Sequence, residues 1–262
     1  MAFSRRFLLS AALALGIMVQ PMVLHAQDDA PVIAAAADLK FAVTEIADAF
    51  KAETGKEVRL SFGSTGNFTT QIREGAPYQM FLAADESYVA KLAAEGFTRD
   101  EGTLYAQGRI VMITPHGSTL KADGSLESLK AALADGTISH FAIANPDHAP
   151  YGVRAMEALQ QAGIWEAVQP KLVLGENVSQ AAQFATSGDA QGGIIAYSLA
   201  LSREVSALGE YELIPADWHE PLNQRMVLLK SAGPIAEEFF AYMNAPAARE
   251  IMKRYGFVLP GE

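Results

Sequence analysis

The 262-residue chain has no cysteine, only two tryptophans and few basic residues. Without cysteine it can form no disulfide, thiolate metal site or iron–sulfur cluster, and it has no thiol nucleophile. Its 20 Lys and Arg residues are outnumbered by 30 Asp and Glu residues, which gives a formal net charge of −10. This balance argues against nucleic acid and anionic lipid surfaces as main partners, because both would repel the chain. Half of the residues are hydrophobic and 19% are charged, as expected of a globular protein with a large core.

Motifs of the common enzyme classes are also missing. The sequence contains no GxSxG nucleophile elbow and no GxxxxGK[ST] phosphate loop, and its histidines lack the i, i+4 spacing of a helical metal site. We therefore expect a binding protein rather than an enzyme. An exported hydrolase that uses Asp38 or Asp85 as its acid or base remains the alternative from that class.

The first 26 residues have the pattern of a signal peptide. Arg5 and Arg6 precede an apolar stretch from Phe7 to Val19, Pro21 interrupts it, and the small residue Ala26 offers a cleavage site. The apolar stretch is shorter than the roughly 20 residues that a membrane-spanning helix needs. The pattern predicts export to the periplasm with cleavage after Ala26. The paired arginines also fit a twin-arginine signal, so the export route stays open.

Beyond the signal peptide, short apolar runs alternate with helical patterns. Strands are expected at 32–36, 58–62, 80–84, 110–114, 141–144, 171–174, 193–196 and 226–229. Alternating strands and helices predict an α/β fold with mainly parallel sheets, in which ligands bind beyond the carboxyl ends of the strands.

The length and the uninterrupted composition favour two lobes joined by crossing strands near Gly108 and near Asn223–Arg225. We expect the first lobe to comprise residues 31–107 and 225–262, and the second lobe residues 108–224.

Four short polar turns follow predicted strands and open predicted helices. They are Ala37-Asp38, Ser64-Thr65-Gly66, Tyr151-Gly152 and Asn177-Val178. The first N–H groups of a helix have no acceptor within it, and the helix dipole favours negative charge there, so such turns can bind an anion. Taken singly, each turn is better explained by ordinary helix capping or packing. Their convergence on one crevice would favour a shared anion site.

The sequence resembles the periplasmic molybdate-binding proteins of ABC transporters over essentially the whole chain after residue 26. The resemblance is carried by the order and spacing of several segments: Ala34–Leu39, Phe50–Gly55, Phe62–Gly66, Gly75–Asp85, Asn145–Gly152 and Arg254–Phe257. It implies a two-lobed periplasmic binding protein fold of type II that holds molybdate or tungstate with uncharged donors. It also implies delivery of this ligand to an ABC permease in the inner membrane, a monomeric state and no cofactor.

Matched position by position, the family's ligand residues fall on five positions of this chain and, less closely, on a sixth. The molybdate oxyanion would be held by Ala37, Asp38, Thr65, Tyr151 and Val178, with Val178 acting through its backbone N–H; Tyr197 lies one place after the tyrosine position of some members.

Asp38 departs from the serine or asparagine that is usual in the family. A carboxylate about 4 Å from a dianion would be repelled by roughly 8 kcal/mol at an effective dielectric constant near 20. We therefore expect the Asp38 side chain to cap its own helix while its backbone N–H faces the ligand. Two alternatives are that Asp38 is protonated, or that the ligand is another oxyanion or a small carboxylate. A periplasmic sensor subunit is a further possible role for the whole protein.

Overall fold

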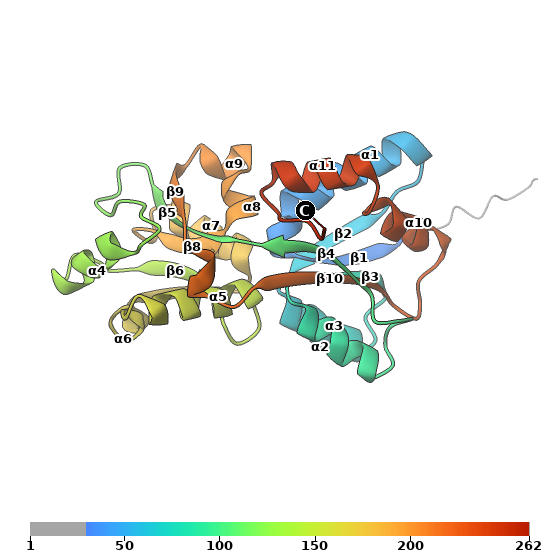
Figure 1. Cartoon of the computed structure of the whole chain (residues 1–262), viewed down its shortest axis with the longest axis horizontal. Helices are drawn as coiled ribbons and strands as arrows, with labels where there is room; N and C mark the ends of the chain where they lie inside the picture. Colours follow the sequence, from blue (N-terminus) through green and yellow to red (C-terminus); the bar gives the residue numbers. More distant parts are fainter. Residues whose placement is uncertain (1–29, 262) are drawn as a thin grey trace, which may run out of the picture.

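The computed structural model describes residues 30–261, and the predicted signal peptide, 1–26, lies outside this range. Two lobes lie side by side along the long axis of the molecule, each built on its own five-stranded sheet (Figure 1). The lobes belong to one α/β architecture in which helices cover both faces of each sheet.

Lobe I contains the first three strands and two later ones, in the order β2-β1-β3-β10-β4. β1 pairs in parallel with β2 and β3, whereas β10 is antiparallel to β3 and β4. The strands are β1 (Val32–Ala36), β2 (Arg59–Gly63), β3 (Tyr78–Ala83), β4 (Thr103–Gly108) and β10 (Leu222–Leu228). The helices of this lobe are α1 (Lys40–Thr54), preceded by the 3-10 turn η1 (Ala37–Leu39), α2 (Thr65–Arg73), α3 (Glu86–Ala94), α10 (Pro234–Tyr242) and α11 (Pro246–Arg254).

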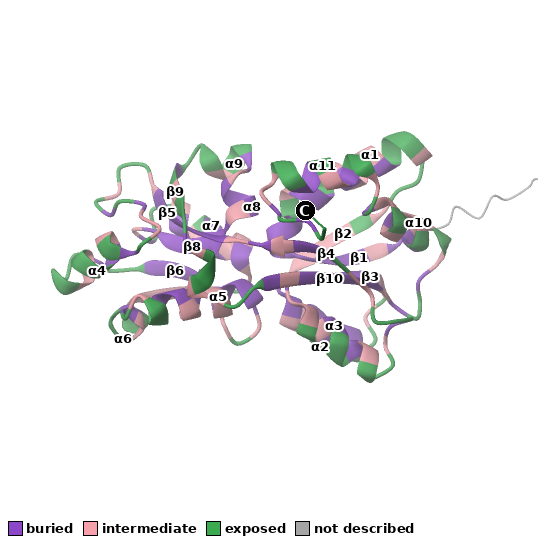
Figure 2. Cartoon of the chain, in the orientation of Figure 1, coloured by how far each residue is buried: buried purple, intermediate pink, exposed green. Residues whose placement is uncertain are grey.

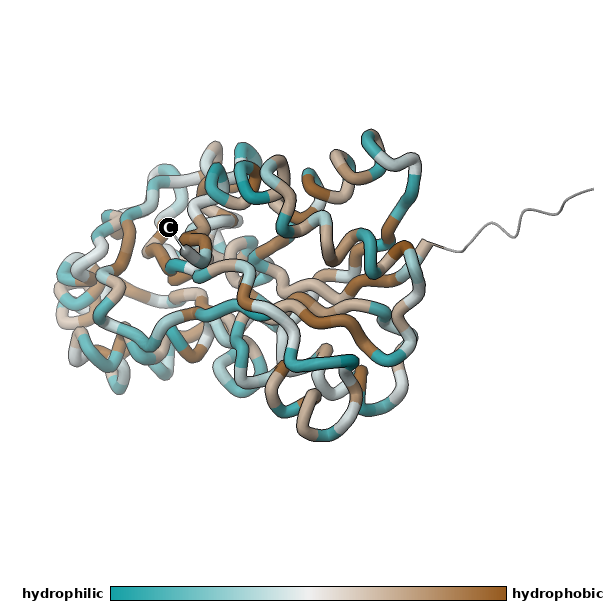
Figure 3. The backbone as a smooth tube through the Cα atoms, turned by 45° about the vertical axis from the view of Figure 1, so that its right-hand side comes forward, coloured by the Kyte–Doolittle hydropathy of each residue, from teal (hydrophilic) through white to brown (hydrophobic). Residues whose placement is uncertain are grey.

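Successive side chains of a strand point to opposite faces of the sheet. Both faces of the lobe I sheet are apolar because apolar residues occupy both sets of positions. Met80 and Leu82 of β3 join the core cluster under α1, α10 and α11, while Phe81 joins the separate cluster under α2 and α3. Figure 2 shows the strands as the buried centre, with exposed surface confined largely to the outer helices and loops, and Figure 3 shows hydrophobic segments along the same strands. The continuous apolar runs seen in the sequence are therefore strands covered on two sides.

Lobe II repeats this pattern of pairing in the order β7-β6-β8-β5-β9. β6 is parallel to β7 and β8, and β5 is antiparallel to β8 and β9. Its strands are β5 (Ile110–Pro115), β6 (Phe141–Ala144), β7 (Leu172–Gly175), β8 (Gly193–Ala196) and β9 (Gly209–Leu213). Its helices are α4 (Glu127–Ala134), α5 (Pro150–Gln161), α6 (Trp165–Val168), α7 (Val178–Thr186), α8 (Tyr197–Ala200) and α9 (Arg203–Ser206), with the 3-10 turns η2 (Gln169–Lys171) and η3 (Ala216–Trp218).

The chain crosses between the lobes twice (Figure 1). β4 ends at Gly108 in the first sheet and β5 begins at Ile110 in the second, so Arg109 alone separates them. The return crossing runs from β9 to β10, and β10 starts at Leu222, inside the range expected for the second lobe. By sheet membership we assign residues 222–261 to lobe I.

The predicted two-lobed α/β fold is confirmed, and each sheet is mixed because the strands next to the crossings enter antiparallel. The strands at 32–36, 141–144 and 193–196 have the predicted bounds, whereas β4 and β9 were not anticipated. Both missed strands lie at sheet edges, where a strand pairs with one other strand of its sheet instead of two. No helix within residues 30–261 has the length and apolarity to cross a membrane.

Candidate functional site

A small cavity between the lobes is lined by the turns that follow five strands. Its walls are Ala36, Ala37, Asp38, Gly63, Ser64, Thr65, Ala84, Ala149, Pro150, Tyr151, Asn177 and Val178. The carboxyl ends of β1, β2 and β3 in lobe I and of β6 and β7 in lobe II therefore meet here. All four polar turns that the sequence suggested lie in this one place, together with Ala84 after β3, which sequence reasoning did not single out.

Several helices begin at the cavity wall. α2 starts at Thr65, α5 at Pro150 and α7 at Val178, and η1 leads into α1 from Ala37. The first N–H groups of these helices have no acceptor within their own helix, and the helix dipoles place partial positive charge around the cavity. This arrangement favours an anion without any ionised basic side chain.

Two of the turns also cap their helices, which was the alternative interpretation of these turns. The Ser64 hydroxyl accepts a hydrogen bond from the Asn67 N–H, and the Asn177 side chain accepts from the N–H groups of Ser179 and Gln180. These caps bind N–H groups of the second and third residues of the helices. They leave Thr65 and Val178, the first helical residues, at the cavity.

Thr65 is fully buried and holds its hydroxyl in a defined orientation. Its Oγ1 accepts a hydrogen bond of 3.0 Å from the Ala84 N–H at the end of β3. A hydroxyl that accepts one bond still has its own proton to donate. Thr65 can therefore offer both a side-chain donor and a helix N-terminal N–H to a bound anion.

Asp38 is the one ionisable carboxyl group of the cavity wall, and it is 1% exposed. Its Oδ2 accepts hydrogen bonds from the Tyr151 hydroxyl at 3.1 Å and from Nε2 of Gln224 at 2.7 Å. The Gln224 Oε1 in turn accepts from the Tyr105 hydroxyl at 2.7 Å. Among the described residues, Asp38 Oδ1 is buried without a hydrogen-bond partner. The carboxyl group is thus held firmly by one oxygen, and the other oxygen is left without a donor.

Burial has a direct effect on the ionisation of this network. It raises the pKa of Asp38 to about 6, because desolvation of the carboxylate outweighs the hydrogen bonds from Gln224 and Tyr151. Burial, with the nearby Asp38 charge, also raises the pKa values of Tyr105 and Tyr151 well above 10. The tyrosines therefore stay protonated at neutral pH, and Asp38 titrates close to it.

The predicted capping role of Asp38 is wrong. Ala36 is the N-cap of η1 and Leu39 the N-cap of α1, and neither helix has a side-chain cap. The Asp38 carboxyl turns instead toward Tyr151 in the other lobe and toward Gln224 on β10. Sequence reasoning missed Gln224 and Tyr105 altogether, because nothing in the alternating pattern of a strand marks a buried amide or phenol as part of a site.

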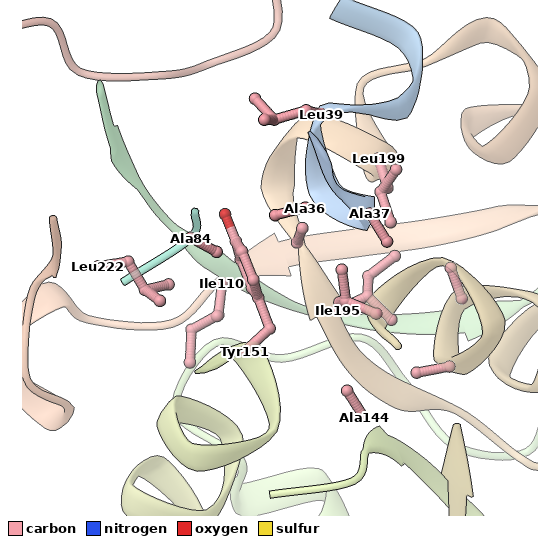
Figure 4. Packing of buried hydrophobic residues seen from close by; sticks show 14 of the residues in the cluster. Ala36, Ala37, Leu39, Ala84, Ile110, Ala144, Tyr151, Ile195, Leu199 and Leu222 are labelled. Atoms are coloured by element: carbon pink, nitrogen blue, oxygen red, sulfur yellow. The ribbon is translucent and has the colours of Figure 1, made fainter. Parts of the chain in front are cut away.

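Tyr151 lines the cavity, but its hydroxyl proton is donated to Asp38. Figure 4 shows its ring rising from α5, with the oxygen on the side where Ala36 and Ala84 lie. A Cβ atom on Gly108 would lie 2.2 Å from the Tyr151 hydroxyl. The glycine at the crossing therefore allows this contact between the lobes.

Two serines of lobe II bind the turn that carries Asp38. Ser179 Oγ donates to the Ala37 carbonyl at 2.9 Å, and Ser198 Oγ donates to the Asp38 carbonyl at 2.7 Å. Both bonds join the lobes, and both fix the η1 backbone by its carbonyls.

The α2 turn is also in contact with lobe II. The Gly66 N–H donates to the His148 carbonyl at 2.9 Å, His148 Nδ1 lies 3.0 Å from Ser64 Oγ, and Asn67 donates to Glu176. A Cβ atom on Gly66 would lie 2.6 Å from the His148 carbonyl oxygen. The lobes are therefore closed on each other at both sides of the cavity.

Tyr197 is the predicted ligand residue that the structure does not bring to the cavity. It begins α8, its N–H donates to the Arg109 carbonyl, and its ring lies 6.0 Å from that of Tyr211 and against Gly256. Of the six predicted positions, Ala37, Asp38, Thr65, Tyr151 and Val178 line one cavity.

The cavity wall carries no lysine, arginine or histidine side chain among the described residues. Within residues 30–261 there is also no cluster of three His, Asp or Glu side chains that could coordinate a metal ion. The chemistry of the wall suits a small anion that is hydrogen-bonded through its oxygens.

Comparison with known proteins places the chain among transport proteins. Residues 31–258 match the family model described as bacterial extracellular solute-binding protein. The molybdate-binding protein ModA of Rhodobacter capsulatus is 35% identical over 92% of this chain and 93% of its own length, and that of Azotobacter vinelandii is 36% identical over 87% and 89%. A solved structure of the periplasmic molybdate-binding protein of Azotobacter vinelandii superimposes with a TM-score of 0.78 at 31% identity, covering 88% of this chain and 99% of that one.

These relatives are binding proteins, not enzymes, and the cavity has the features of a binding site. The chain therefore belongs to the bacterial extracellular solute-binding proteins and, within them, to the family of the molybdate-binding proteins ModA.

Proposed function

We propose that this protein captures molybdate, or the similar tungstate, outside the cytoplasm and delivers it to the permease of an ABC importer. The oxyanion is its transported ligand and not a cofactor. The observation that carries the proposal is the meeting of helix N-termini from both lobes at one cavity with uncharged donors on its wall. The named relatives at 35% and 36% identity support molybdate as the ligand.

The proposed ligand residues are Ala37, Asp38, Thr65, Tyr151 and Val178. Thr65 supplies its hydroxyl and its N–H, and Val178 supplies the N–H that opens α7. Hydrogen bonds to a charged group each contribute about 1.5–3 kcal/mol. A few of them offset the dehydration of a compact dianion and leave tight binding.

Donors that are fixed in the backbone favour selection by size. The N–H groups of α2 and α7 are held by their caps and by the contacts between the lobes, so they cannot adjust to anions of different radius. Molybdate and tungstate are larger than sulfate, and we expect the closed site to discriminate on that basis.

The lobes contact each other beside this small cavity, through Gly66 and His148 and through Tyr151 and Asp38. Entry of a ligand therefore requires the lobes to part about the crossings at Arg109 and before Leu222. Binding is then capture by hinge closure: the anion docks on one lobe and the other lobe closes over it.

Export with cleavage after Ala26, residence in the periplasm, a monomeric state and a permease in the inner membrane complete the proposal. The paired arginines and the apolar stretch of residues 1–26 support export. The description of the matching family as extracellular agrees with it.

A thermal-shift panel with molybdate, tungstate, sulfate, phosphate and small carboxylates tests the proposed ligand. A ligand that binds only the folded state stabilises it by about 2.7 kcal/mol at a concentration one hundred times its Kd. We expect molybdate and tungstate to raise the melting temperature, with sulfate and phosphate giving much smaller shifts. A larger shift with phosphate or a carboxylate would contradict the assignment and favour a receptor for that ligand.

A further inference from the structure

The Asp38 carboxyl group presents a problem that the proposed function alone does not solve. Its ionised form would be repelled by any dianion in the cavity, yet the carboxyl group is held in the wall by Tyr151 and Gln224, and the backbone carbonyl of the same residue is held by Ser198. It cannot turn away to solvent, because it is 1% exposed and the lobes close over it.

The two carboxyl oxygens are not equivalent. Oδ2 already accepts two hydrogen bonds, from the Tyr151 hydroxyl and the Gln224 amide. Oδ1 is buried and has no partner among the described residues. A proton added to this carboxyl group therefore belongs on Oδ1, because this oxygen has no hydrogen-bond partner and belongs to a residue of the cavity wall.

We infer that Asp38 binds the oxyanion in its neutral form, with the Oδ1–H donating a hydrogen bond to an oxygen of the ligand, so that capture of each dianion takes up one proton. The inference rests on the proposed function and adds a specificity-determining residue to it. The balance is simple: the proton comes from solvent, the carboxylate becomes a carboxylic acid, and no bond of the oxyanion is broken.

None of the groups around Asp38 is expected to take up the proton in its place. Tyr105 on β4 and Tyr151 on α5 face it, and both have pKa values well above 10. Gln224 on β10 and Ser198 on α8 are not ionisable. Lys40 follows on the same turn, but it is exposed and lies over the Phe41 ring, 5.5 Å from its centre.

In the closed structure burial raises the pKa of Asp38 to about 6, and this value sets the pH range in which we expect the effect. Above pH 6 the free site is ionised and must acquire a proton, so the Kd should rise tenfold per pH unit once the pH is well above that value. Below pH 6 the carboxyl is already neutral, and the Kd should level off. An asparagine at this position keeps a donor beside the cavity but has no proton to gain.

Isothermal titration of the whole exported chain with molybdate measures the linkage directly. Binding enthalpies in buffers of different ionisation enthalpy give the number of protons taken up. We expect close to one proton per molybdate at pH 8 and about a tenfold rise in Kd between pH 7 and pH 8. For Asp38→Asn we expect no proton uptake, a constant Kd and tighter binding than the original chain at pH 8.

Two control variants separate the inference from a general effect of charge. Asp147→Asn removes an exposed carboxyl from the loop before α5, and it should leave proton uptake and Kd unchanged. His148→Gln removes the imidazole that contacts Ser64 between the lobes, and proton uptake should persist. Asp38→Ser, which keeps a hydroxyl donor, replaces Asp38→Asn if the latter does not fold.

Each outcome decides the matter. Molybdate binding with no proton uptake and a constant Kd would overturn the role of Asp38 and leave the proposed function intact. Proton uptake that persists in Asp38→Asn would overturn it as well. Absence of molybdate binding by the original chain at every pH would overturn the proposed function itself. Tighter binding of phosphate than of molybdate at pH 8, without proton uptake, would mean that an ionised Asp38 accepts the proton that hydrogen phosphate already carries.

Discussion

The two lobes share a strand-pairing pattern but contribute different chemistry to the cavity. In both sheets the second strand, β1 or β6, is parallel to its two neighbours, and the fourth strand, β10 or β5, lies next to a crossing and runs antiparallel. Lobe I supplies the ionisable Asp38 and the buried Gln224 that binds it. Lobe II supplies the phenol of Tyr151, the start of α7 and two serines that bind the η1 backbone. The same strand arrangement thus carries the ionisable group of the cavity in lobe I and the side chains that bind the η1 turn across the cavity in lobe II.

The largest expected effect is on stability, and it tests the buried carboxyl group that lobe I contributes to the cavity. Asp38→Asn removes a carboxyl group whose pKa burial raises to about 6. A raised pKa means that the folded state binds the proton more tightly than the unfolded state, so the original chain loses stability as pH rises from about 4 through 6. The free energy of unfolding of the variant, relative to that of the original chain, should therefore be roughly 3 kcal/mol higher at pH 8 than at pH 4.

Urea unfolding of both proteins at pH 4, 6 and 8 measures this difference. The matched control is Asp147→Asn, since Asp147 is exposed. If the difference in free energy of unfolding between Asp38→Asn and the original chain stays constant with pH, burial does not raise the pKa of Asp38 in the folded state.

The next prediction removes one side-chain donor from each lobe. Thr65→Ala takes away a hydroxyl at the start of α2, and Tyr151→Phe takes away the phenol that holds Asp38 in place. We expect the double variant to bind molybdate ten to a hundred times more weakly, as two lost hydrogen bonds predict. Calorimetry at pH 6 measures it, and an unchanged Kd would contradict the assignment of the site.

Closure itself is tested at Gly66. A Cβ atom there would lie 2.6 Å from the His148 carbonyl oxygen across the lobe contact, so Gly66→Ala should hold the lobes apart and weaken binding severalfold. Small-angle scattering with molybdate should show a larger radius of gyration than for the original chain. Gly233→Ala, whose added Cβ meets only the Gln79 Oε1 at 3.4 Å, is the control that should behave normally. The same radius of gyration for both variants with molybdate would contradict the prediction that the Gly66–His148 contact limits closure.

The smallest effects come from ion pairs, and they should differ by location. Arg154 of α5 pairs with Asp85 of lobe I at 3.2 Å, with side chains 11% and 19% exposed. Arg73 and Glu95 pair within lobe I, with both side chains about 40% exposed. Exposed pairs contribute about 0–1 kcal/mol. Arg73→Ala should leave molybdate affinity unchanged, whereas Arg154→Ala should weaken it a few-fold by loosening closure; the same result for both in calorimetry would argue against a link between the lobes at Arg154.

The fold and the turns of the site could be predicted because their signals are local. β1 and β6 are short uncharged apolar runs; η1 follows β1 directly, and α5 begins at Pro150 after a short loop that follows β6. These features indicate both the strand and the place where its turn must lie. β9 could not be found in the same way, because the charged residues of Gly209–Leu213 hide an edge strand that is held mainly by its pairing with β5.

The direction of the Asp38 side chain could not be predicted from its neighbours. A helix start favours an acidic cap, but the donors that hold Asp38 are Tyr151 and Gln224, 113 and 186 residues away along the chain. Once folding brings both donors to the carboxyl group, their hydrogen bonds replace the local cap. Tyr197 illustrates the same limit, since its place against Gly256 and Tyr211 depends on the packing of distant segments.

A crystal structure of the chain grown with molybdate, with the metal located by its anomalous scattering, tests the central claim most directly. The account predicts one anion between the lobes, with its oxygens 2.7–3.2 Å from the N–H groups of Thr65 and Val178 and no lysine, arginine or histidine side chain in contact. An anion bound elsewhere, or one held by an ionised basic side chain, would contradict it.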